Sequence, residues 1–333
     1  MHRSYVTLSE VAEAAGVSRS QASRALRGDP GVREEVRERV QEKALELGYH
    51  VNVAARQLAS GRATGVGVVV GEPMNPYHMM MATEISDALV RKDLDPMISL
   101  GRAGVEVTPD QVEPLLRHRV GALILIGSPR DPQAVAEIGR RIPVVYIGED
   151  LTGLGLRCVI GDDETGARMA TEHLIAKGHR EIAHISGGDG AGARGRAEGY
   201  AAAMRDAGLE PVIQRGWFDL DGGQAGADAL MARRTRPTAI FAANDRIAMG
   251  AMNRLLHLGY RVPEDVAVIG YDDAIDSGSE TVSLTSVRQS SSLFGEFSAG
   301  LVAEMLSRRD GPLLKVVPVE LIVRRSSDFV RTA

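Results

Sequence analysis

The chain has 333 residues, and 39 Lys and Arg against 44 Asp and Glu give it a formal net charge of -5 at pH 7. Hydrophobic residues make up 44% and charged residues 25%, which is the balance of a globular protein with more than one domain. The single cysteine, Cys158, excludes a disulfide framework, and no apolar run resembles a signal peptide or membrane span. We therefore expect a cytoplasmic protein without a membrane partner.

The first fifty residues have the pattern of three short helices and no strand signal. Two pairs with capping-box spacing, Thr7 with Glu10 and Ser18 with Gln21, mark the starts of the first two helices. The third helix is expected from about residue 33 to residue 47, where apolar positions fall on one face.

The first two helices, separated by Ala-Gly-Val, have the spacing of a helix-turn-helix. The second helix directs Arg19, Ser20, Ser23 and Arg24 outward. In such motifs the first residues of the second helix enter the major groove, where arginine bonds guanine and serine bonds either base edge. Residues 1–62 hold ten Lys and Arg against eight Asp and Glu, a weak sign of a polyanionic partner. A solvated amphipathic helix has the same spacing, so the pattern alone leaves both interpretations open.

An alanine-rich segment, Asn52 to Ser60, follows the head. It is expected to be a short helix within a linker, and a helix of this length forms only against a partner.

From Gly65 onward, apolar strands alternate with helical patterns. Continuous apolar strands separated by helices predict parallel sheets covered on both faces, and the alternation is long enough for two of them. The expected strands are GVGVVV, DPMISL, GALILIG, PVVYIG, EIAHISG, TAIFAAND and VAVIGYDD.

Polar residues follow several of these strands: Asn75, Asn244 with Asp245, and Asp272 with Asp273. The carboxyl ends of parallel strands form the ligand crevice of an open sheet, which favours a binding role. Asx residues also cap helices and turns, so each of these positions has a second interpretation.

Several motifs together resemble the lactose-repressor (LacI/GalR) family of bacterial transcription regulators. The head and hinge of the family resemble VTLSEVAEAAGVSRSQASRALRG, VREEVRERVQEKALELGY and NVAARQLASGR. Its regulatory core resembles DDETGARMATEHLIAKGHREIAHISG, RAEGYAAAM, FAANDRIAMGAMNRLLHLGYRVPEDVAVIGYDD, SLTSVRQ and VELIVRRSS.

The resemblance implies roles in DNA binding. Arg19, Ser20 and Arg24 match the base-reading positions of the family, and Gln21 and Ser23 lie nearer the phosphates.

Leu58 matches the leucine that wedges into the minor groove and kinks the duplex at the operator centre. Packing against a dimer mate is a compatible second role.

The resemblance also implies a periplasmic-binding-protein-like α/β core with three crossings between its two subdomains. The expected divisions are a head at 1–50, a hinge helix and linker at 51–63, a first subdomain at 64–161 plus 290–319, and a second at 162–289 plus 320–333. Effector-lining positions are matched by Asn75, Tyr77, Arg196, Asn244, Asp272 and Gln289. Such groups suit the hydroxyls of a sugar or the edges of a nucleobase.

Two departures from the family pattern affect these expectations. Arg33 replaces the usual serine cap, so the third helix relies on Glu34 and Glu35 against its dipole. Leu220 lies near the place of a stacking aromatic and Trp217 lies three residues earlier, which weakens the case for a simple pyranose platform.

Gly190 to Gly195 form a literal G-x-G-x-x-G between a strand and a helix. Because the chain has 37 glycines, we interpret this stretch as a loop that places Arg196 rather than as a nucleotide site. No catalytic constellation and no histidine pair with metal-ligand spacing is evident, so we expect no enzyme activity, cofactor or metal.

The sequence therefore predicts a homodimeric repressor on a near-palindromic operator, controlled by a small molecule, with a sugar or sugar derivative as the first expectation and a purine or nucleoside as the second. A solute-binding sensor without a DNA role and a nucleotide-dependent enzyme using the Gly190 loop are the alternatives from other classes.

Overall fold

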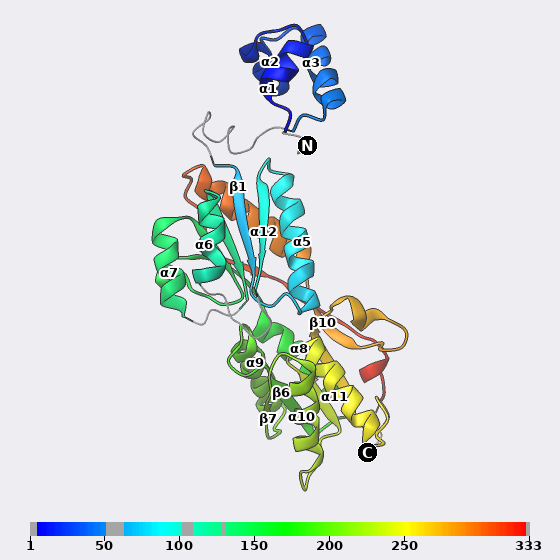
Figure 1. The fold of residues 1–333 in the computed structure, drawn as a ribbon. Coiled ribbons are helices and arrows are strands. Elements are labelled where there is room, and N and C mark those ends of the chain that lie inside the picture. The colour runs from blue at the N-terminus through cyan, green and yellow to red at the C-terminus, as the bar shows by residue number, and fades with distance from the viewer. Residues whose placement is uncertain (1–4, 51–62, 102–108, 128–130, 331–333) are drawn as a thin grey trace. The chain divides into compact units, whose positions relative to one another are not determined.

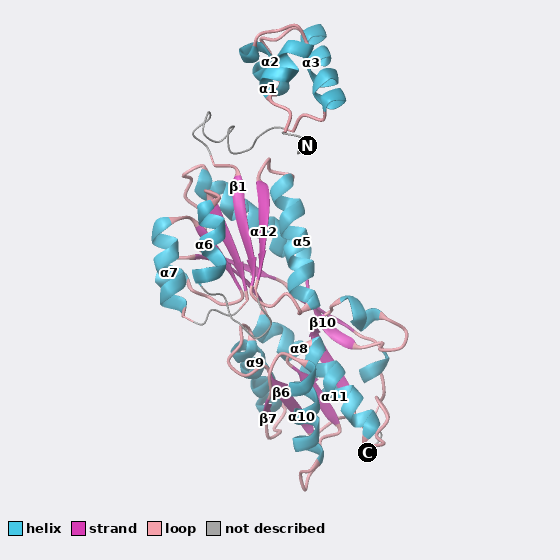
Figure 2. Ribbon diagram, viewed as in Figure 1, coloured by secondary structure: helices cyan, strands magenta, loops and turns pink. Residues whose placement is uncertain are grey.

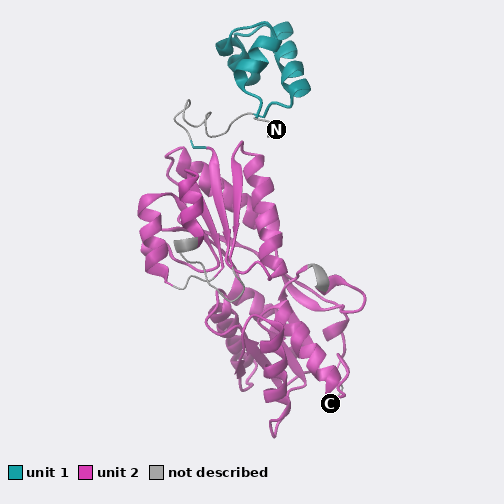
Figure 3. Cartoon of the chain, viewed as in Figure 1, with its two compact units in different colours: residues 1–63 teal, residues 64–333 magenta. Residues whose placement is uncertain are grey.

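The computed structural model describes residues 5–50, 63–101, 109–127 and 131–330 (Figure 1). The chain divides into two compact units, residues 1–63 and 64–333 (Figure 3). The expected hinge helix and Leu58 lie outside the described residues.

The head contains three helices, α1 (Leu8–Ala14), α2 (Arg19–Leu26) and α3 (Glu34–Leu47). Thr7 and Glu10 form the complete capping box, since the Thr7 side chain accepts from the Glu10 N–H and the Glu10 carboxylate accepts from the Thr7 N–H at 2.7 Å. The Ser18 hydroxyl accepts from the Gln21 N–H at 3.2 Å and caps α2. The spacing-based starts of both helices are therefore present in the structure.

Arg33 makes no side-chain capping bond, and Glu34 and Glu35 occupy the first turn of α3 as expected.

Small residues let the three helices of the head pack closely. The buried set is Val11, Ala12, Ala15, Ala22, Ala25, Val32, Val40 and Ala44.

The first sheet has six parallel strands in the order β11-β5-β4-β3-β1-β2 (Figure 2). Helices α5 and α12 pack on one face, and α6 and α7 on the other. The strands are β1 (Gly65–Val70), β2 (Asp95–Leu100), β3 (Ala122–Ile126), β4 (Val144–Ile147), β5 (Arg157–Gly161) and β11 (Leu314–Val317). The helices are α5 (Pro76–Val90), α6 (Pro109–Arg117), α7 (Pro132–Arg141) and α12 (Ser291–Leu306).

The second sheet has the order β12-β10-β9-β8-β6-β7, with α8 and α9 on one face and α10 and α11 on the other. Its edge strand β12 runs antiparallel to β10, which is common at the edge of an otherwise parallel sheet. The strands are β6 (Ile182–Ser186), β7 (Val212–Arg215), β8 (Ala239–Ala242), β9 (Ala267–Asp272), β10 (Thr285–Gln289) and β12 (Val319–Ile322). The helices are α8 (Asp163–Ala176), α9 (Ala193–Asp206), α10 (Leu220–Met231) and α11 (Asp245–His257).

The chain crosses between the sheets three times: from β5 to α8, from β10 to α12, and from β11 to β12. Val319 pairs with Gln289 in the second sheet, so the last crossing lies between Val317 and Val319. The α/β class with two doubly wound sheets is confirmed.

Candidate functional site

The exposed face of α2 carries most of the side chains expected to read DNA. Ala22 and Ala25 are fully buried against the rest of the head, which fixes the rotation of the helix. On the opposite side of the helix Arg19, Ser20 and Gln21 are exposed to solvent, and Ser23 is half-buried. The first turn of α2 is therefore free to enter a groove.

Arg24 is held by a carboxylate of the same head. Its Nε donates to Asp29 Oδ2 at 2.8 Å and its Nη2 to Asp29 Oδ1 at 3.3 Å, a bidentate pair. Asp29 Oδ1 also accepts from the Gly31 N–H at 2.8 Å. The hydrogen bond from Arg24, with the one from Gly31, lowers the pKa of Asp29 to about 2, so the pair stays charged. The guanidinium is positioned before any ligand binds.

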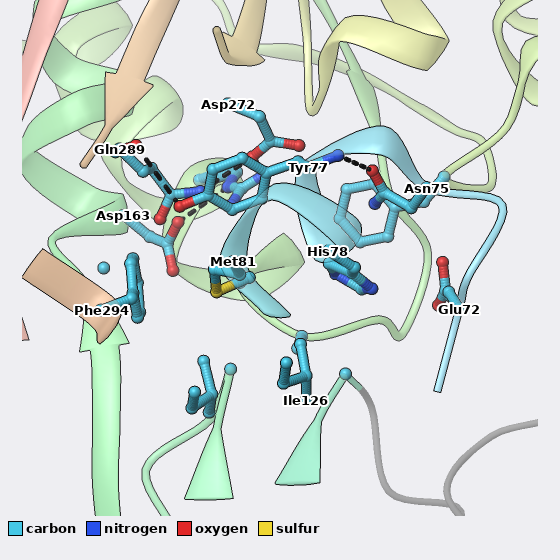
Figure 4. Close-up of a pocket in the computed structure, with 18 residues that line it drawn as sticks. Glu72, Asn75, Tyr77, His78, Met81, Ile126, Asp163, Asp272, Gln289 and Phe294 are labelled. Carbon is cyan, nitrogen blue, oxygen red and sulfur yellow. Dashed lines mark hydrogen bonds and ion pairs between the residues drawn. The ribbon is translucent and has the colours of Figure 1, made fainter. Parts of the chain in front are cut away.

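A cavity lies between the two sheets at the carboxyl ends of their strands. It contains about 560 Å³ of empty space, a figure that includes solvent at its open mouth. Figure 4 shows the lining residues around it. Asn75, Tyr77, Arg196, Asp272 and Gln289, expected from the sequence, all line this cavity.

Arg196 organises the second-sheet side of the cavity. Its Nε donates to Asp163 Oδ1 at 2.8 Å, its Nη1 donates to the Ala243 carbonyl at 2.6 Å, and its guanidinium lies 3.8 Å from the Tyr271 ring centroid. Only 6% of Arg196 is exposed. These contacts fix one plane of N–H donors in a site from which water is largely excluded.

Asp272 faces Arg196 from the end of β9. Its Oδ1 lies 3.6 Å from Arg196 Nη1 and accepts from Gln289 Nε2 at 2.8 Å. Both contacts use Oδ1, so among the described residues Oδ2 is left for a ligand. The backbone φ of Asp272 is 101° and that of Asp273 is 52°, two successive strained residues of the kind that binding sites retain.

The first-sheet side of the cavity is formed at the start of α5. Asn75 Oδ1 accepts from the Tyr77 N–H at 3.1 Å and caps the helix, and the Tyr77 hydroxyl donates to the Gln289 carbonyl at 3.5 Å. Figure 4 shows Asn75 and Tyr77 beside His78. The start of α5 and the end of β10 are thereby joined beside the cavity.

Burial changes the ionisation of the lining groups. It raises the pKa of Asp272 to about 7 against the opposing effect of Arg196, and it raises the pKa of Asp163. It lowers the pKa of His78 to about 4, helped by the positive charges of Arg196 and Arg246. Near neutral pH His78 is therefore uncharged, while the guanidinium of Arg196 favours the charged form of Asp272 against the effect of burial on its pKa.

Asn244, the sixth expected effector residue, does not line the cavity. It is buried, and its side chain caps α11 by accepting from the Ile247 N–H at 2.9 Å. The neighbouring Asp245 carboxylate accepts from Ala274 N–H at 2.8 Å and from the Ser277 and Ser286 hydroxyls at 2.5 Å and 2.6 Å. Asp245 therefore holds the turn that follows Asp272, while Asn244 serves as the cap of α11.

The glycine loop serves packing. Gly192 precedes α9 with φ of 77°, and a Cβ there would lie 2.9 Å from Asp163 Oδ2 and 3.1 Å from Arg196 Nη2. A Cβ at Gly190 would lie 2.6 Å from the Phe218 ring. The glycines let the backbone approach the Asp163–Arg196 pair and Phe218.

Sequence reasoning missed Asp163, His78, Phe218 and Phe294, all of which line the cavity. Asp163 could have been predicted by the strand-end rule, because Asp162 and Asp163 come directly after a strand and Asp272 lies at the end of one. Phe218 supplies an aromatic ring next to Trp217, which is 57% exposed. No pattern in the sequence distinguishes these two neighbours.

Within the described parts of the chain, no group of three or more His, Cys, Asp or Glu is placed to hold a metal ion. None of the described helices is long and apolar enough to cross a bilayer.

A helix-turn-helix head joined to a two-sheet ligand-binding core defines a class of transcriptional regulators. Residues 7–52 match the family model "Bacterial regulatory proteins, lacI family", and residues 171–327 match "Periplasmic binding protein-like domain". The HTH-type transcriptional regulator CelR of Thermobifida fusca is 34% identical over 96% of this chain and 98% of that regulator.

Two solved structures are similar over nearly the whole chain. The lac repressor dimer bound to operator and the anti-inducer ONPF has a TM-score of 0.85 at 29% identity, covering 97% of this chain and 99% of that one. The CelR–cellobiose complex has a TM-score of 0.70 at 32% identity, covering 96% and 99%. The chain belongs to the LacI family of DNA-binding transcriptional regulators, as the motifs predicted.

Proposed function

We propose that this chain represses transcription as a homodimer on a near-palindromic operator and that a sugar bound between its two sheets controls the affinity for DNA. The observation that carries the proposal is the cavity, whose polar side chains come from both sheets and converge on one space. A ligand there contacts both subdomains and favours one angle between them.

A sugar suits the chemistry of this cavity. Asp272 Oδ2 accepts from hydroxyls, Arg196 donates to them, and Asn75 does both. Phe218 and Phe294 supply apolar rings for the faces of a sugar. The CelR structure that holds cellobiose supports this ligand class.

In the proposed complex with DNA, Arg19, Ser20 and Arg24 contact base edges, Gln21 and Ser23 contact phosphates, and Leu58 is the minor-groove wedge. The lac repressor structure, a dimer bound to operator, supports a symmetric arrangement with two half-sites. We propose that the protein acts in the cytoplasm and that it catalyses no reaction.

A thermal-shift screen tests the ligand. Cellobiose, monosaccharides and nucleosides are compared, and each hit is added to a binding assay on a duplex that the full-length protein selects from a random-sequence library. We expect a sugar to raise the melting temperature and to change the affinity for the selected duplex. If a nucleoside is the only compound that binds, the proposal that the ligand is a sugar is wrong. If the protein enriches no duplex, the proposal that it regulates transcription by binding DNA is wrong.

Asp272→Asn tests the site. The amide keeps an acceptor for Gln289 and tolerates the left-handed backbone, but it loses the charge that faces Arg196. Loss of a hydrogen bond to a charged group predicts sugar binding weaker by about 1.5–3 kcal/mol, measured by calorimetry, with affinity for the selected duplex unchanged. Asp206→Asn, exposed at the end of α9, is the control; equal sugar affinity in both variants contradicts the assignment.

A further inference from the structure

Basic residues gather along the edge of the first sheet at which its strands begin, that is, at the N-terminal ends of the strands. All six strands are parallel, so the turns that follow α5, α6, α7 and α12 lie at the same edge, where the strands begin. We name as the basic edge the exposed residues Arg91, Lys92, Arg117 and Arg119, together with Arg140, Arg141, Arg308 and Arg309.

The second sheet provides an internal comparison. From the last two residues of each helix to the next strand, the first sheet has eight Lys or Arg and two Asp or Glu, whereas the second sheet has seven and five. Basic residues at helix C-termini are favoured by the helix dipole in both sheets. Because the helix dipole acts equally in both sheets, it does not account for the smaller number of acidic residues at this edge of the first sheet.

Positive charge on the basic edge is also unpaired. Within the described residues, none of its eight side chains forms an ion pair, while Lys177 and Arg261 at the corresponding edge of the second sheet pair with Asp328 and Asp265. Eight exposed cations on one edge of a protein with net charge -5 repel one another, and a polyanion relieves that repulsion.

Part of the basic edge is hollowed. Arg140, Arg141, Arg308 and Arg309 line one shallow, open surface together with Arg157, and Asp310 is the one acidic residue among its lining residues. Arg157 is anchored there, because its Nη1 pairs with Glu304 at 3.1 Å and its Nη2 donates to the Arg309 carbonyl at 3.1 Å. Arg157, at the start of β5, thereby holds the turn after α12 against the sheet, and the arginines of the turns after α7 and α12 line the same surface.

The chain from the head enters the core at this same edge. β1 begins at Gly65, whose carbonyl accepts from the Gly121 N–H at 2.7 Å, and the Asp95 N–H donates to the Thr64 carbonyl at 2.9 Å. The chain that follows the head therefore joins the core on the side that is positively charged.

We propose that the basic edge binds phosphates of the duplex that the head reads, so that the core contributes directly to DNA affinity. This inference rests on the proposed DNA-binding function. Six strands at about 4.8 Å spacing make the edge roughly 24 Å wide, which is the axial length of about seven base pairs of duplex at 3.4 Å rise. These contacts add affinity that does not depend on base sequence.

The test compares two full-length variants that each remove four exposed charges. One changes Arg140, Arg141, Arg308 and Arg309 to Gln on the basic edge. The other changes Arg205, Arg233, Arg234 and Arg236 to Gln at the corresponding edge of the second sheet. Net charge is the same in both, so any difference between them is local.

Binding to a duplex selected by the unmodified protein is measured from low to high salt. We expect the basic-edge variant to flatten the dependence of log affinity on log salt by roughly one unit for each lost phosphate contact, with base preference retained, and the control to keep the original slope. Equal slopes in the two variants overturn the inference while leaving the proposed function intact. Failure to select any duplex overturns the proposed function, and the inference with it.

A small anion is the competing ligand. If the basic-edge variant keeps the DNA salt slope but loses thermal stabilisation by inorganic phosphate that the control retains, the arginines bind a small anion and the DNA inference is wrong.

Discussion

Arg24 shows how one residue is prepared for recognition within its own domain. A bidentate contact restricts the guanidinium, which reduces the conformational entropy lost when it binds a base. The same contact places a carboxylate beside a group that would otherwise attract any phosphate. In the proposed complex with DNA, we therefore expect Asp29 to favour contact of Arg24 with a base over its non-specific attraction to phosphates.

Asp29→Asn tests this role. The amide oxygen can accept only part of the bidentate pair, so we expect weaker discrimination of one base pair and stronger binding to unrelated DNA. The measurement is the ratio of affinities for the selected duplex and a scrambled one, at fixed salt. Arg24→Ala should lower that ratio further, by about 1–3 kcal/mol in free energy.

Glu38→Gln is the control for charge, because it removes one exposed acidic group from α3 without touching Arg24. If Asp29→Asn changes the ratio no more than Glu38→Gln does, Asp29 has no positioning role.

At the scale of elements, the sequence predicts best where burial is complete. β1, β3, β4 and β9 follow the apolar runs closely, since strands buried on both faces read as continuous hydrophobic stretches. The expected strands do not include β7, β11 and β12, which are short and half-exposed, or β5 and β10, in which polar residues interrupt the apolar run.

The cavity could be predicted only in part. The strand-end rule identifies Asp272 because a strongly apolar strand precedes it. Phe218 and Phe294 contribute ring faces, and their positions depend on packing between elements that are distant in sequence. The same rule wrongly places Asn244 in the cavity, because the side chain of this strand-end asparagine caps α11 instead.

Gly192 at the start of α9 gives an element-scale prediction. Gly192→Ala adds a Cβ against Asp163 and Arg196 and strains a backbone at φ of 77°. We expect about 1 kcal/mol of lost stability from the backbone and, in addition, weaker sugar binding because Arg196 must move. Denaturant unfolding and calorimetry measure the two effects.

Gly208→Ala separates them. Gly208 follows the same helix with φ of 68°, and a Cβ there meets no atom within 4 Å. Its substitution should destabilise the fold through the backbone alone. Normal sugar binding by the Gly192 variant at a comparable loss of stability would contradict the packing role of the loop.

At the scale of the whole core, control by a ligand requires the two subdomains to change their relative angle. Gly148 follows β4 in the first subdomain, and a Cβ there would lie 2.9 Å from Ala191 Cβ in the second. Cysteines at these positions reach the usual Cβ–Cβ separation of a disulfide, about 3.5–3.8 Å, once the two segments move apart by roughly 0.6–0.9 Å. The natural Cys158 is buried and should not interfere.

Gly148→Cys/Ala191→Cys should therefore fix the angle between the subdomains when oxidised. We expect the oxidised protein to bind the selected duplex with an affinity that no longer responds to the sugar, and the response to return on reduction. The reduced form is its own control for any strain at Gly148, whose φ is 130°. A full sugar response in the oxidised protein would show that ligand control does not pass through closure of the subdomains, since the crosslink forbids that motion.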